Sequence, residues 1–226
     1  MKFLNYSQYF DNKIKLFLTQ SDPFWDRDYP ISRKQKISEK FHLEDKSIII
    51  PTQVHGDEVA VLSDQLKEPE CDAIIYKANS NLVGAINIAD CIPICIYAPL
   101  ADNIALIHSG WRGTCKKIVI KAINVLQEIG SEKKMFKIFL GPSIKGCCYE
   151  VEKEFAQEFD LSSIIKDKGK YFVELSNQVK FDLERVQIPS ENIIIDDLCT
   201  YDSLDCHSFR RDGKKAGRMT FFAYRD

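Results

Sequence analysis

The sequence predicts a mixed α+β fold built around a substantial mixed β-sheet. Strand-like and helix-like segments alternate along the whole chain, as is typical of such domains. Four apolar stretches between residues 71 and 108 are nearly continuous, as expected for strands that are covered on both faces. The chain has 226 residues, 45% hydrophobic and 28% charged, which is the composition of a globular protein, and we expect one domain.

The N-terminal half begins with a predicted strand over residues 13–19 and a helix over residues 32–43, with Ser32 at its cap position. Residues 47–54 and 57–62 are rich in β-branched side chains and predict two further strands. Gly, Asn, Asp or Pro bounds each of the four apolar stretches, so we expect them to be consecutive strands of one sheet system. These stretches are CDAIIYK, LVGAINIA, IPICIYAP and NIALIH.

The C-terminal half begins with a predicted amphipathic helix over residues 114–129. Apolar residues recur there at helical spacing, and Gly130 follows as a natural terminator. The other predicted elements are, in order, a strand over 135–141, helices over 152–159 and 176–187, a strand over 191–197 and, after a basic turn, a terminal apolar strand.

The charge balance argues against large anionic partners. The formal net charge is −2, so the chain lacks the global basic field that draws proteins to nucleic acid or to anionic membranes. The N-terminus has no apolar leader, and the apolar runs are interrupted by Asp, Pro or Lys before they could span a bilayer. We therefore expect a cytoplasmic protein with a small polar substrate.

Eight cysteines would allow disulfides, but without a secretory signal, and in a chain large enough to build its own core, we expect reduced thiols. Most are expected to be packing residues, as free cysteines usually are. This expectation includes the adjacent pair Cys147 and Cys148, together with Cys95 and Cys115 in apolar or helical runs.

Three candidate metal ligands stand at the ends of predicted strands. Cys91 ends Ala-Asp-Cys, and Pro93 just after it favours an exposed edge or a bend. His108 ends NIALIH and His55 ends PTQVH, where Gly56 permits a tight turn. Two imidazoles and one thiolate are a plausible ligand set for a catalytic zinc, which keeps its fourth position open. Their separations, 36 residues (91 − 55) and 17 residues (108 − 91), match no compact zinc spacing, so a packing role for each remains an alternative.

Several segments together resemble the YfiH-like family, also called laccase-domain or polyphenol oxidase proteins. The resemblance covers roughly residues 47–220 and implies one laccase domain over 1–226, with a divergent, shortened part over 1–46. It also implies a sandwich of mixed β-sheets flanked by helices, similar in fold to the catalytic domain of a deamidating bacterial toxin. Zinc binding by His55, Cys91 and His108 is implied as well. The segments are QVHG, CDAII, ADCIPICIYAP, IALIHSGWRG, FLGPSIKGCCYEV and CTYDSLDCHSFRRDGKKAGR.

The resemblance implies phosphorolysis of the purine nucleosides adenosine, inosine, guanosine and 5'-methylthioadenosine, together with deamination of adenosine. A zinc with an open position lowers the pKa of its water and supplies a nucleophile for the purine C6. Asp90 next to Cys91 is either a general acid or base or a carboxylate hydrogen-bonded to the turn. We expect small-molecule partners, a nucleoside and phosphate, with no nucleic acid and no membrane, and a monomer or small homo-oligomer.

Phosphorolysis requires a phosphate site, and the planar fork of arginine binds such oxyanions bidentately. Arg112 and Arg210 are the leading candidates, with Arg211 and Arg218 nearby in the sequence. Ser208 and Gln53 stand in matching motifs and are predicted to contact the substrate. Trp111 is expected either to pack under the metal loop or to stack on a purine.

The chain departs from the family pattern at three places. Many relatives have a TR-x-GG segment where this chain has Thr-Gln-Ser-Asp-Pro at residues 19–23, and this loss of an arginine weakens the expected phosphate site. His207 replaces an aromatic residue, either as an extra imidazole near the site or as a space-filling side chain. Asn87 replaces a threonine that is common in relatives, a minor change.

Three alternatives remain open at this point. Copper at the same ligands would suit a laccase-like polyphenol oxidase, but a multicopper oxidase needs more than the four histidines of this chain. A metal-free hydrolase would use Cys91 as nucleophile and His108 as base. A zinc-stabilised binding module would close the site with His207 or Cys95 as a fourth ligand. The H-x-E and P-C-x-x-C motifs of conventional zinc deaminases are missing, so deamination here would be convergent.

Overall fold

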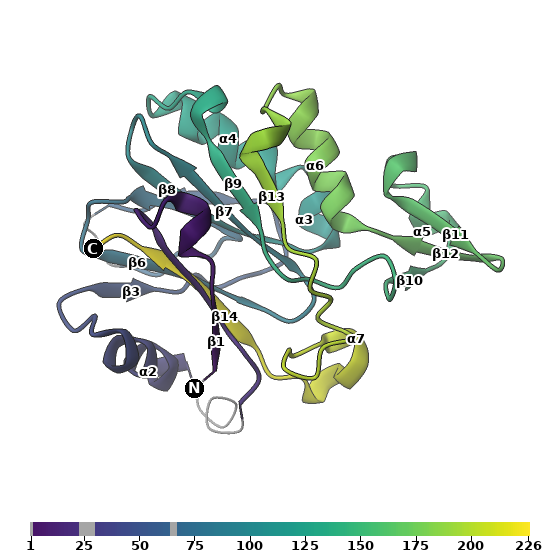
Figure 1. Cartoon of the computed structure of the whole chain (residues 1–226), viewed down its shortest axis with the longest axis horizontal. Coiled ribbons are helices and arrows are strands. Elements are labelled where there is room, and N and C mark those ends of the chain that lie inside the picture. Colours follow the sequence, from purple (N-terminus) through teal and green to yellow (C-terminus); the bar gives the residue numbers. More distant parts are fainter. Residues whose placement is uncertain (1, 23–29, 64–66) are drawn as a thin grey trace.

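The computed structural model describes residues 2–22, 30–63 and 67–226. In this part of the chain two mixed β-sheets stack face to face, with helices on their outer faces (Figure 1). The five-stranded sheet has the order β1 (Phe3–Asn5), β2 (Lys15–Thr19), β14 (Met219–Tyr224), β6 (Leu82–Ile88), β3 (Ser47–Ile49). The six-stranded sheet has the order β13 (Ile193–Ile195), β9 (Lys137–Leu140), β7 (Ile92–Ala98), β8 (Asn103–Ser109), β5 (Ala73–Lys77), β4 (Val59–Val61).

The remaining elements cover the sandwich or extend from it (Figure 1). A small sheet has the order β10 (Glu150–Val151), β12 (Lys170–Val173), β11 (Ile164–Asp167). The α-helices of the described residues are α2 (Pro30–Phe41), α3 (Trp111–Cys115), α4 (Ile118–Glu128), α5 (Lys153–Ala156), α6 (Leu175–Arg185) and α7 (Phe209–Asp212). The mixed α+β class predicted from the sequence is confirmed.

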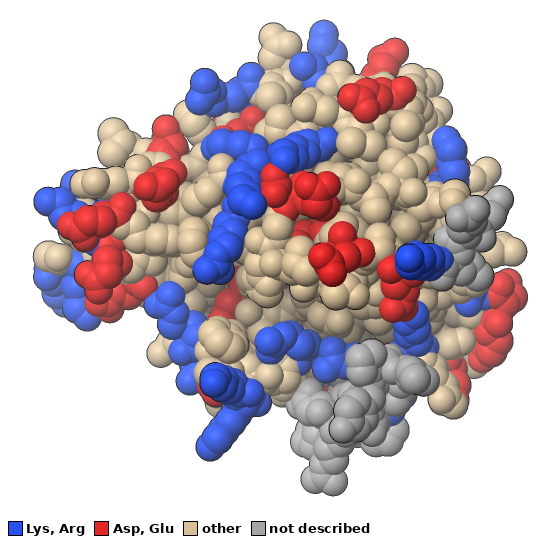
Figure 2. Space-filling view, turned by 180° about the vertical axis from the view of Figure 1, so that it is seen from behind, with Lys and Arg blue, Asp and Glu red and all other residues tan. Residues whose placement is uncertain are grey.

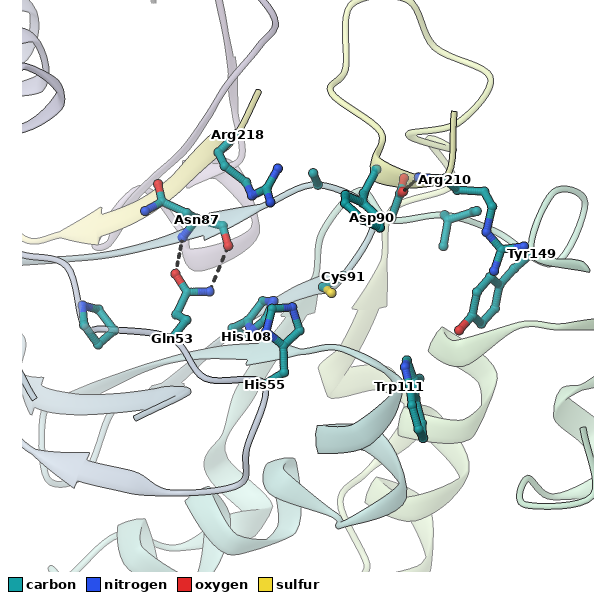
Figure 3. A pocket seen from close by; sticks show the side chains of 14 residues that line it. Gln53, His55, Asn87, Asp90, Cys91, His108, Trp111, Tyr149, Arg210 and Arg218 are labelled. Atoms are coloured by element: carbon teal, nitrogen blue, oxygen red, sulfur yellow. Dashed lines mark hydrogen bonds between the residues drawn. The ribbon is translucent and has the colours of Figure 1, made fainter. Parts of the chain in front are cut away.

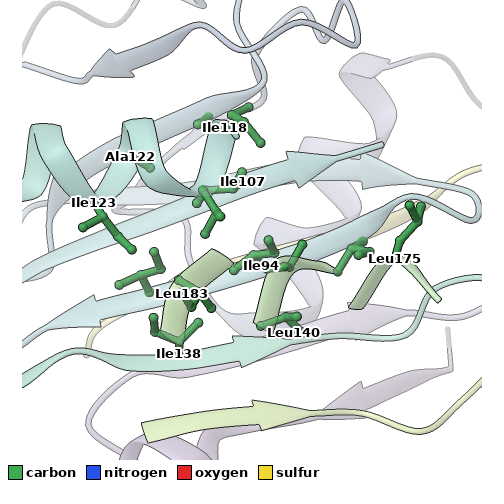
Figure 4. Close-up of a cluster of buried hydrophobic side chains, with 14 of the residues drawn as sticks. Ile94, Ile107, Ile118, Ala122, Ile123, Ile138, Leu140, Leu175 and Leu183 are labelled. Carbon is green, nitrogen blue, oxygen red and sulfur yellow. The ribbon is translucent and has the colours of Figure 1, made fainter. Parts of the chain in front are cut away.

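Three hydrophobic layers hold the sandwich together. The outermost two lie between the six-stranded sheet and α4 with α6, and between the five-stranded sheet and α2. The middle layer lies between the two sheets. Along β7, Ile94 and Ile96 belong to the layer under α4 and α6, whereas Cys95 and Tyr97 belong to the middle layer (Figure 4). This alternation buries both faces of the strand, which explains its continuous apolar sequence.

The four apolar stretches form the consecutive strands β5 to β8, as predicted, but β6 lies in the other sheet of the sandwich. This strand pairs with β14 and β3 in the five-stranded sheet, while β5, β7 and β8 belong to the six-stranded sheet. Ile86 and Ile88 of β6 contribute to the layer between the sheets. The link over residues 89–91 therefore crosses from one sheet to the other, and it carries Asp90 and Cys91.

The predicted helix over 114–129 is interrupted. Helix α3 ends at Cys115, and α4 begins at Ile118 after Lys117, which has a left-handed φ of 61°. This break lets the two helices take different directions, so that α3 approaches the strand ends while α4 covers the sheet. Gly130 follows α4 with a φ of 90° and donates to the carbonyl of Gln127, which confirms it as the terminator.

Other element boundaries also differ from the predicted ones. Helix α2 begins at Pro30, so Ser32 lies inside it rather than at its cap, and the strand predicted over 47–54 ends at Ile49. The predicted helix over 152–159 shortens to α5, and the pairing of β11 with β12 that follows was not predicted. Pro93 was expected at an exposed edge or a bend, but it is buried in central strand β7. The register of β7 with β9 begins at Ile94, and just before it the Pro93 carbonyl accepts the N–H of Gly141 at 2.8 Å, so the proline lies at the end of this ladder, where a missing N–H is tolerated.

Over the described residues, no helix combines the length and apolar character needed to cross a membrane. The face opposite to that of Figure 1 has lysines and arginines among aspartates and glutamates (Figure 2). Both signs of charge alternate there instead of forming a broad basic field, in agreement with the net charge of −2.

Candidate metal centre and pocket

Three separate segments bring His55, Cys91 and His108 together. One nitrogen of each histidine and the Cys91 Sγ all lie within 4.8 Å of one another, and the two imidazole rings are 4.8 Å apart. His108 lies near the end of β8, Cys91 precedes β7, and His55 lies in the loop after β3 rather than at the end of a strand. We call these three residues the His–Cys–His centre.

The backbone around this centre is shaped for close approach. His55 and Asp90 both have left-handed backbones, with φ of 56° and 83°, which non-glycine residues rarely adopt and which occur preferentially at functional sites. Gly110, at the start of α3, lies so near Cys91 that an added Cβ would be 2.9 Å from the sulfur. The glycine of HSGWRG therefore makes room for the thiol.

Asp72 holds the centre from behind. Its Oδ1 lies 2.8 Å from His108 Nδ1, and its carboxylate accepts the backbone N–H groups of Val54, His55 and Gly56 at 3.2, 3.1 and 2.6 Å. One fully buried carboxylate thus fixes both the His108 ring and the loop that carries His55. No role was predicted for Asp72, and the sequence signal for one is a charged residue at the head of the apolar stretch CDAII.

The electrostatics of the centre favour a thiolate. Burial raises the pKa of Cys91, but contacts with His108 and His55 outweigh burial and lower that pKa to about 7. Burial lowers the pKa of His108, but its hydrogen bonds to Asp72 and Cys91 outweigh burial and raise that pKa to about 9. Without a metal, Cys91 and His108 therefore favour a thiolate beside an imidazolium at neutral pH.

The donor set fits a bound metal. His108 uses Nδ1 toward Asp72, which leaves Nε2 for a cation, and a carboxylate on the far nitrogen is typical of metal-bound histidine. In the described part of the chain, neither His207 nor Cys95 belongs to this group of ligands. Cys95 is fully buried in the layer between the sheets, as predicted, and His207 is also buried. The arrangement thus favours three ligands over the closed four-ligand alternative.

The centre opens into a pocket of about 620 Å³. In Figure 3, Cys91 and the two histidines lie between Gln53 with Asn87 on one side and Trp111 with Tyr149 on the other. The lining residues are Pro51, Gln53, His55, Asn87, Ala89, Asp90, Cys91, His108, Trp111, Ile144, Tyr149, Phe209, Arg210 and Arg218. Volume and lining suit a small, partly aromatic molecule.

Asp90 lines the pocket, but its carboxylate is already engaged. It accepts hydrogen bonds from Thr200 Oγ1 at 2.6 Å, from Ser208 Oγ at 3.0 Å and from the Arg210 N–H at 2.7 Å. Ser208 is fully buried and also accepts the N–H of Arg211 at the start of α7. These bonds favour the hydrogen-bonded interpretation of Asp90, and they connect Ser208 to the pocket through Asp90.

Two of the candidate arginines line the pocket. The Arg210 guanidinium lies 4.8 Å from the Tyr149 ring and donates to the Glu150 carbonyl at 2.7 Å. Arg218 lies above Gln53 and Asn87 on the other side (Figure 3) and donates to the neighbouring carbonyls of residues 216 and 217. Each guanidinium has five N–H donors, so both retain donors for an anion.

The other two arginines have different surroundings. Arg211 donates to the carbonyls of Thr200, Tyr201, Ser203 and Cys206 and pairs with Asp212, so it holds the loop before α7 together. Arg112 stacks on Trp111 at 4.2 Å and is not among the residues that line the pocket. Trp111 packs on Phe155 at 5.0 Å and also lines the pocket, and its stacking on a purine stays a prediction.

A further arginine approaches the pocket from α2. Arg33 donates to Asn87 Oδ1 at 3.1 Å, and Asn87 lines the pocket. Gln53 is bonded at both ends of its amide to the Asn87 backbone, at 2.8 and 2.7 Å. Of the segment that replaces TR-x-GG, Thr19 is buried and accepts the N–H of Thr220, while Pro23 lies outside the described residues.

Several known proteins are similar to this chain over most of its length. A family model described as multi-copper polyphenol oxidoreductase laccase matches residues 26–226. A purine nucleoside phosphorylase of Clostridium acetobutylicum is 36% identical over 179 residues, covering 75% of this chain and 73% of that protein. A purine nucleoside phosphorylase of Aquifex aeolicus is 35% identical over 176 residues, covering 77% and 82%.

Solved structures show the same fold. The hypothetical protein YfiH of Bacillus licheniformis matches with a TM-score of 0.84 at 23% identity, over 95% of this chain and 94% of that one. A Neisseria meningitidis protein matches with a TM-score of 0.84 at 19% identity over 100% of both chains. The sandwich flanked by helices is thereby confirmed. From the family model and the two phosphorylase relatives it follows that this chain belongs to the laccase-domain family, also called YfiH-like.

Proposed function

We propose that this chain is a zinc-dependent purine nucleoside phosphorylase that also deaminates adenosine. The proposed substrates are adenosine, inosine, guanosine and 5'-methylthioadenosine. The observation that carries the proposal is the convergence of three metal ligands on one pocket that also presents two arginines and several aromatic rings. The names of the Clostridium acetobutylicum and Aquifex aeolicus relatives support the same activity.

Zinc is the metal proposed for the His–Cys–His centre. Two imidazole nitrogens and one thiolate are ligands that zinc prefers, and three protein ligands leave one position open. When bound there, zinc supplies a Lewis acid and lowers the pKa of a water molecule toward neutrality, as deamination at the purine C6 requires. Asp72 holds His108 in the orientation and tautomer that ligation needs.

Phosphorolysis breaks the bond between the ribose C1' and the purine nitrogen and forms a bond from C1' to a phosphate oxygen. Arg210 and Arg218 are the proposed phosphate ligands, since both line the pocket and both retain donors. Trp111, Tyr149 and Phe209 are proposed to cover the purine rings. Asp90 is assigned a positioning role, because it accepts the backbone N–H of Arg210 and thereby places that arginine.

A metal-free cysteine hydrolase is the second candidate, and one observation favours it. The arrangement matches a cysteine triad, in which Cys91 would be the nucleophile, His108 the base and Asp72 the carboxylate that orients the base. The pKa of Cys91 lies at about 7. The same three groups can therefore serve covalent catalysis when no metal is bound. Removal of the metal separates the two candidates, because phosphorolysis requires the metal and the hydrolase does not.

The test combines metal analysis with product analysis. Protein purified without chelator is analysed for zinc and copper and is incubated with inosine or adenosine, with and without phosphate. We expect about one zinc at the His–Cys–His centre and release of the base with ribose 1-phosphate only when phosphate is present. Absence of turnover by zinc-loaded protein contradicts the proposal. Activity that needs copper and oxygen indicates an oxidase, and thiol-sensitive hydrolysis after complete metal removal indicates the hydrolase.

A further inference from the structure

A second group of potential ligands lies outside the His–Cys–His centre. One ligand atom each of Cys147, Cys148, Cys199 and Asp202 lies within 4.8 Å of every other. We call these four residues the thiol cluster. The first two precede β10, and the other two follow β13. The sequence interpretation of Cys147 as a packing residue is wrong, because this side chain is exposed.

Backbone contacts fix the two segments of the thiol cluster against each other. Ser143 forms an isolated parallel bridge with Cys199, and the N–H of Thr200 donates to the Ser143 carbonyl at 3.1 Å. The N–H of Lys145 donates to the Cys199 Sγ at 3.5 Å. A backbone donor on a buried sulfur stabilises negative charge on that sulfur, as a metal-binding thiolate requires.

The spacing of the ligand atoms is close to that of a tetrahedral site. A zinc with bonds of about 2.3 Å to sulfur and about 2.1 Å to oxygen places two sulfurs roughly 3.8 Å apart and a sulfur and an oxygen roughly 3.6 Å apart. The sulfurs of Cys147 and Cys148 are 3.2 Å apart, and Asp202 oxygens lie 3.6 and 3.3 Å from them. These three distances lie within roughly 0.6 Å of the tetrahedral values, and the Cys199 Sγ lies within 4.8 Å of each of the other ligand atoms.

We propose that the thiol cluster is a second metal site, with four protein ligands, for a thiophilic divalent cation such as zinc. Cysteine sulfur selects soft and borderline cations over magnesium or calcium, which prefer oxygen. As the cation binds, the three thiols release their protons to solvent. Exposed Cys147 and Asp202 provide the route of entry, and buried Cys199 anchors the site to the fold.

A cation in the thiol cluster would brace the neighbouring pocket. Tyr149, which follows Cys148 in the chain, lines the pocket. Thr200, which follows Cys199, donates to Asp90 at 2.6 Å. The cation would cross-link the two segments that carry these residues, a structural role that fits four protein ligands. This inference does not depend on what reaction the pocket catalyses.

Zinc stoichiometry of the full-length protein tests this proposal. Protein is saturated with zinc, freed of loosely bound metal by gel filtration and analysed by mass spectrometry for metal per chain. We expect Cys147→Ser and Cys199→Ser each to hold about one zinc fewer than the unmodified chain. Cys115→Ser, a half-buried thiol outside both groups, and Asp205→Asn, an exposed carboxylate near Asp202 in the sequence, are the matched controls. Equal stoichiometry in all of these proteins overturns the proposal.

Cobalt then identifies the ligands independently of the first centre. In a Cys91→Ser background, added cobalt should give the intense sulfur-to-metal absorption of a site with several thiolates, and Cys147→Ser should remove it. Cys147 is exposed, so its replacement is expected to leave the fold intact, as circular dichroism checks. No such absorption in the Cys91→Ser background contradicts the proposal. A disulfide among the three cysteines of protein kept with zinc and without reductant would also contradict it.

Discussion

The His–Cys–His centre and the thiol cluster both contain cysteine sulfur, but they differ in the number and surroundings of their side chains. The former has three potential metal ligands, lines a pocket, and has one imidazole held by a buried carboxylate. The latter has four ligands, none of which is among those lining that pocket. Three ligands leave a coordination position for a reactant, whereas four close the site. Ligand number and access, rather than the presence of cysteine, therefore distinguish the proposed reactive site from the proposed bracing site.

The largest effect should follow the removal of a ligand from the His–Cys–His centre. We expect His108→Ala to lose the metal there and to lower phosphorolysis roughly 100-fold to 1000-fold, because a catalytic metal contributes several kcal/mol. Cys199→Ser should lower the rate less, since it acts only through pocket geometry. Metal per chain and inosine turnover are measured for both variants. An equal loss of activity in the two variants would contradict the proposed difference between the His–Cys–His centre and the thiol cluster.

Asp72 offers a finer test of what supports the reactive centre. We expect Asp72→Asn to weaken zinc binding at this centre about 10-fold to 100-fold, because the amide orients His108 poorly. The matched control is Asp57→Asn, a carboxylate in the same loop region that pairs with Lys116 and Lys121. Competition with a chromophoric chelator measures the affinity, and thermal unfolding verifies the fold. An unchanged zinc affinity in Asp72→Asn would show that Asp72 does not support metal binding at this centre.

Replacing the pocket arginines should weaken phosphate binding but should not change metal binding. We expect Arg210→Ala and Arg218→Ala each to raise the KM for phosphate about 10-fold, as loss of a charge-assisted contact worth about 1.5 kcal/mol implies. Zinc content should stay unchanged. Arg185→Ala on the surface of α6 serves as the control. If Arg112→Ala raises this KM more than either pocket variant, the sequence preference for Arg112 is right and the pocket assignment is wrong.

The smallest effect is a difference in thiol reactivity within metal-free protein. The histidines lower the Cys91 pKa to about 7, whereas burial and neighbouring thiol and carboxylate groups raise the pKa of Cys148. At pH 7.5 iodoacetamide should therefore modify Cys91 before Cys148, with a rate that rises through pH 7. His108→Ala removes the stabilising cation, so the Cys91 pKa should rise and its rate at pH 7 should fall about tenfold. Peptide mapping measures both rates, and preferential modification of Cys148 would contradict this reasoning.

Periodicity predicted the fold class well but not the membership of each sheet. The apolar runs of β5 to β8 indicate burial on both faces, which is what the three layers provide. They cannot indicate which sheet a strand joins, because β6 and β7 have equally apolar sequences and differ only in their partners. Lys117 likewise interrupts a helix whose apolar spacing continues without a break. Tertiary packing decided both features.

Site residues of a rare and chemically distinctive type could be predicted from the sequence. Residues whose role depends on the direction of the side chain could not. His55, Cys91 and His108 stand out in a chain with four histidines, and the structure brings them together as expected. The roles of the arginines could not be separated, because the four have the same chemistry and differ only in direction. Tyr149 and Phe209 lie in two of the segments that carry the family resemblance, but nothing in those segments indicates that these two aromatic side chains reach the pocket.

Anomalous diffraction from crystals grown with zinc tests the comparison most directly. Diffraction data collected on both sides of the zinc absorption edge locate each zinc ion. The refined structure then shows which atoms bind each ion. We predict one ion bound by His55, Cys91 and His108 with a non-protein fourth ligand, and a second bound by the four residues of the thiol cluster. No anomalous peak between the two histidines, or a fourth protein ligand there, would contradict the account of an open reactive centre.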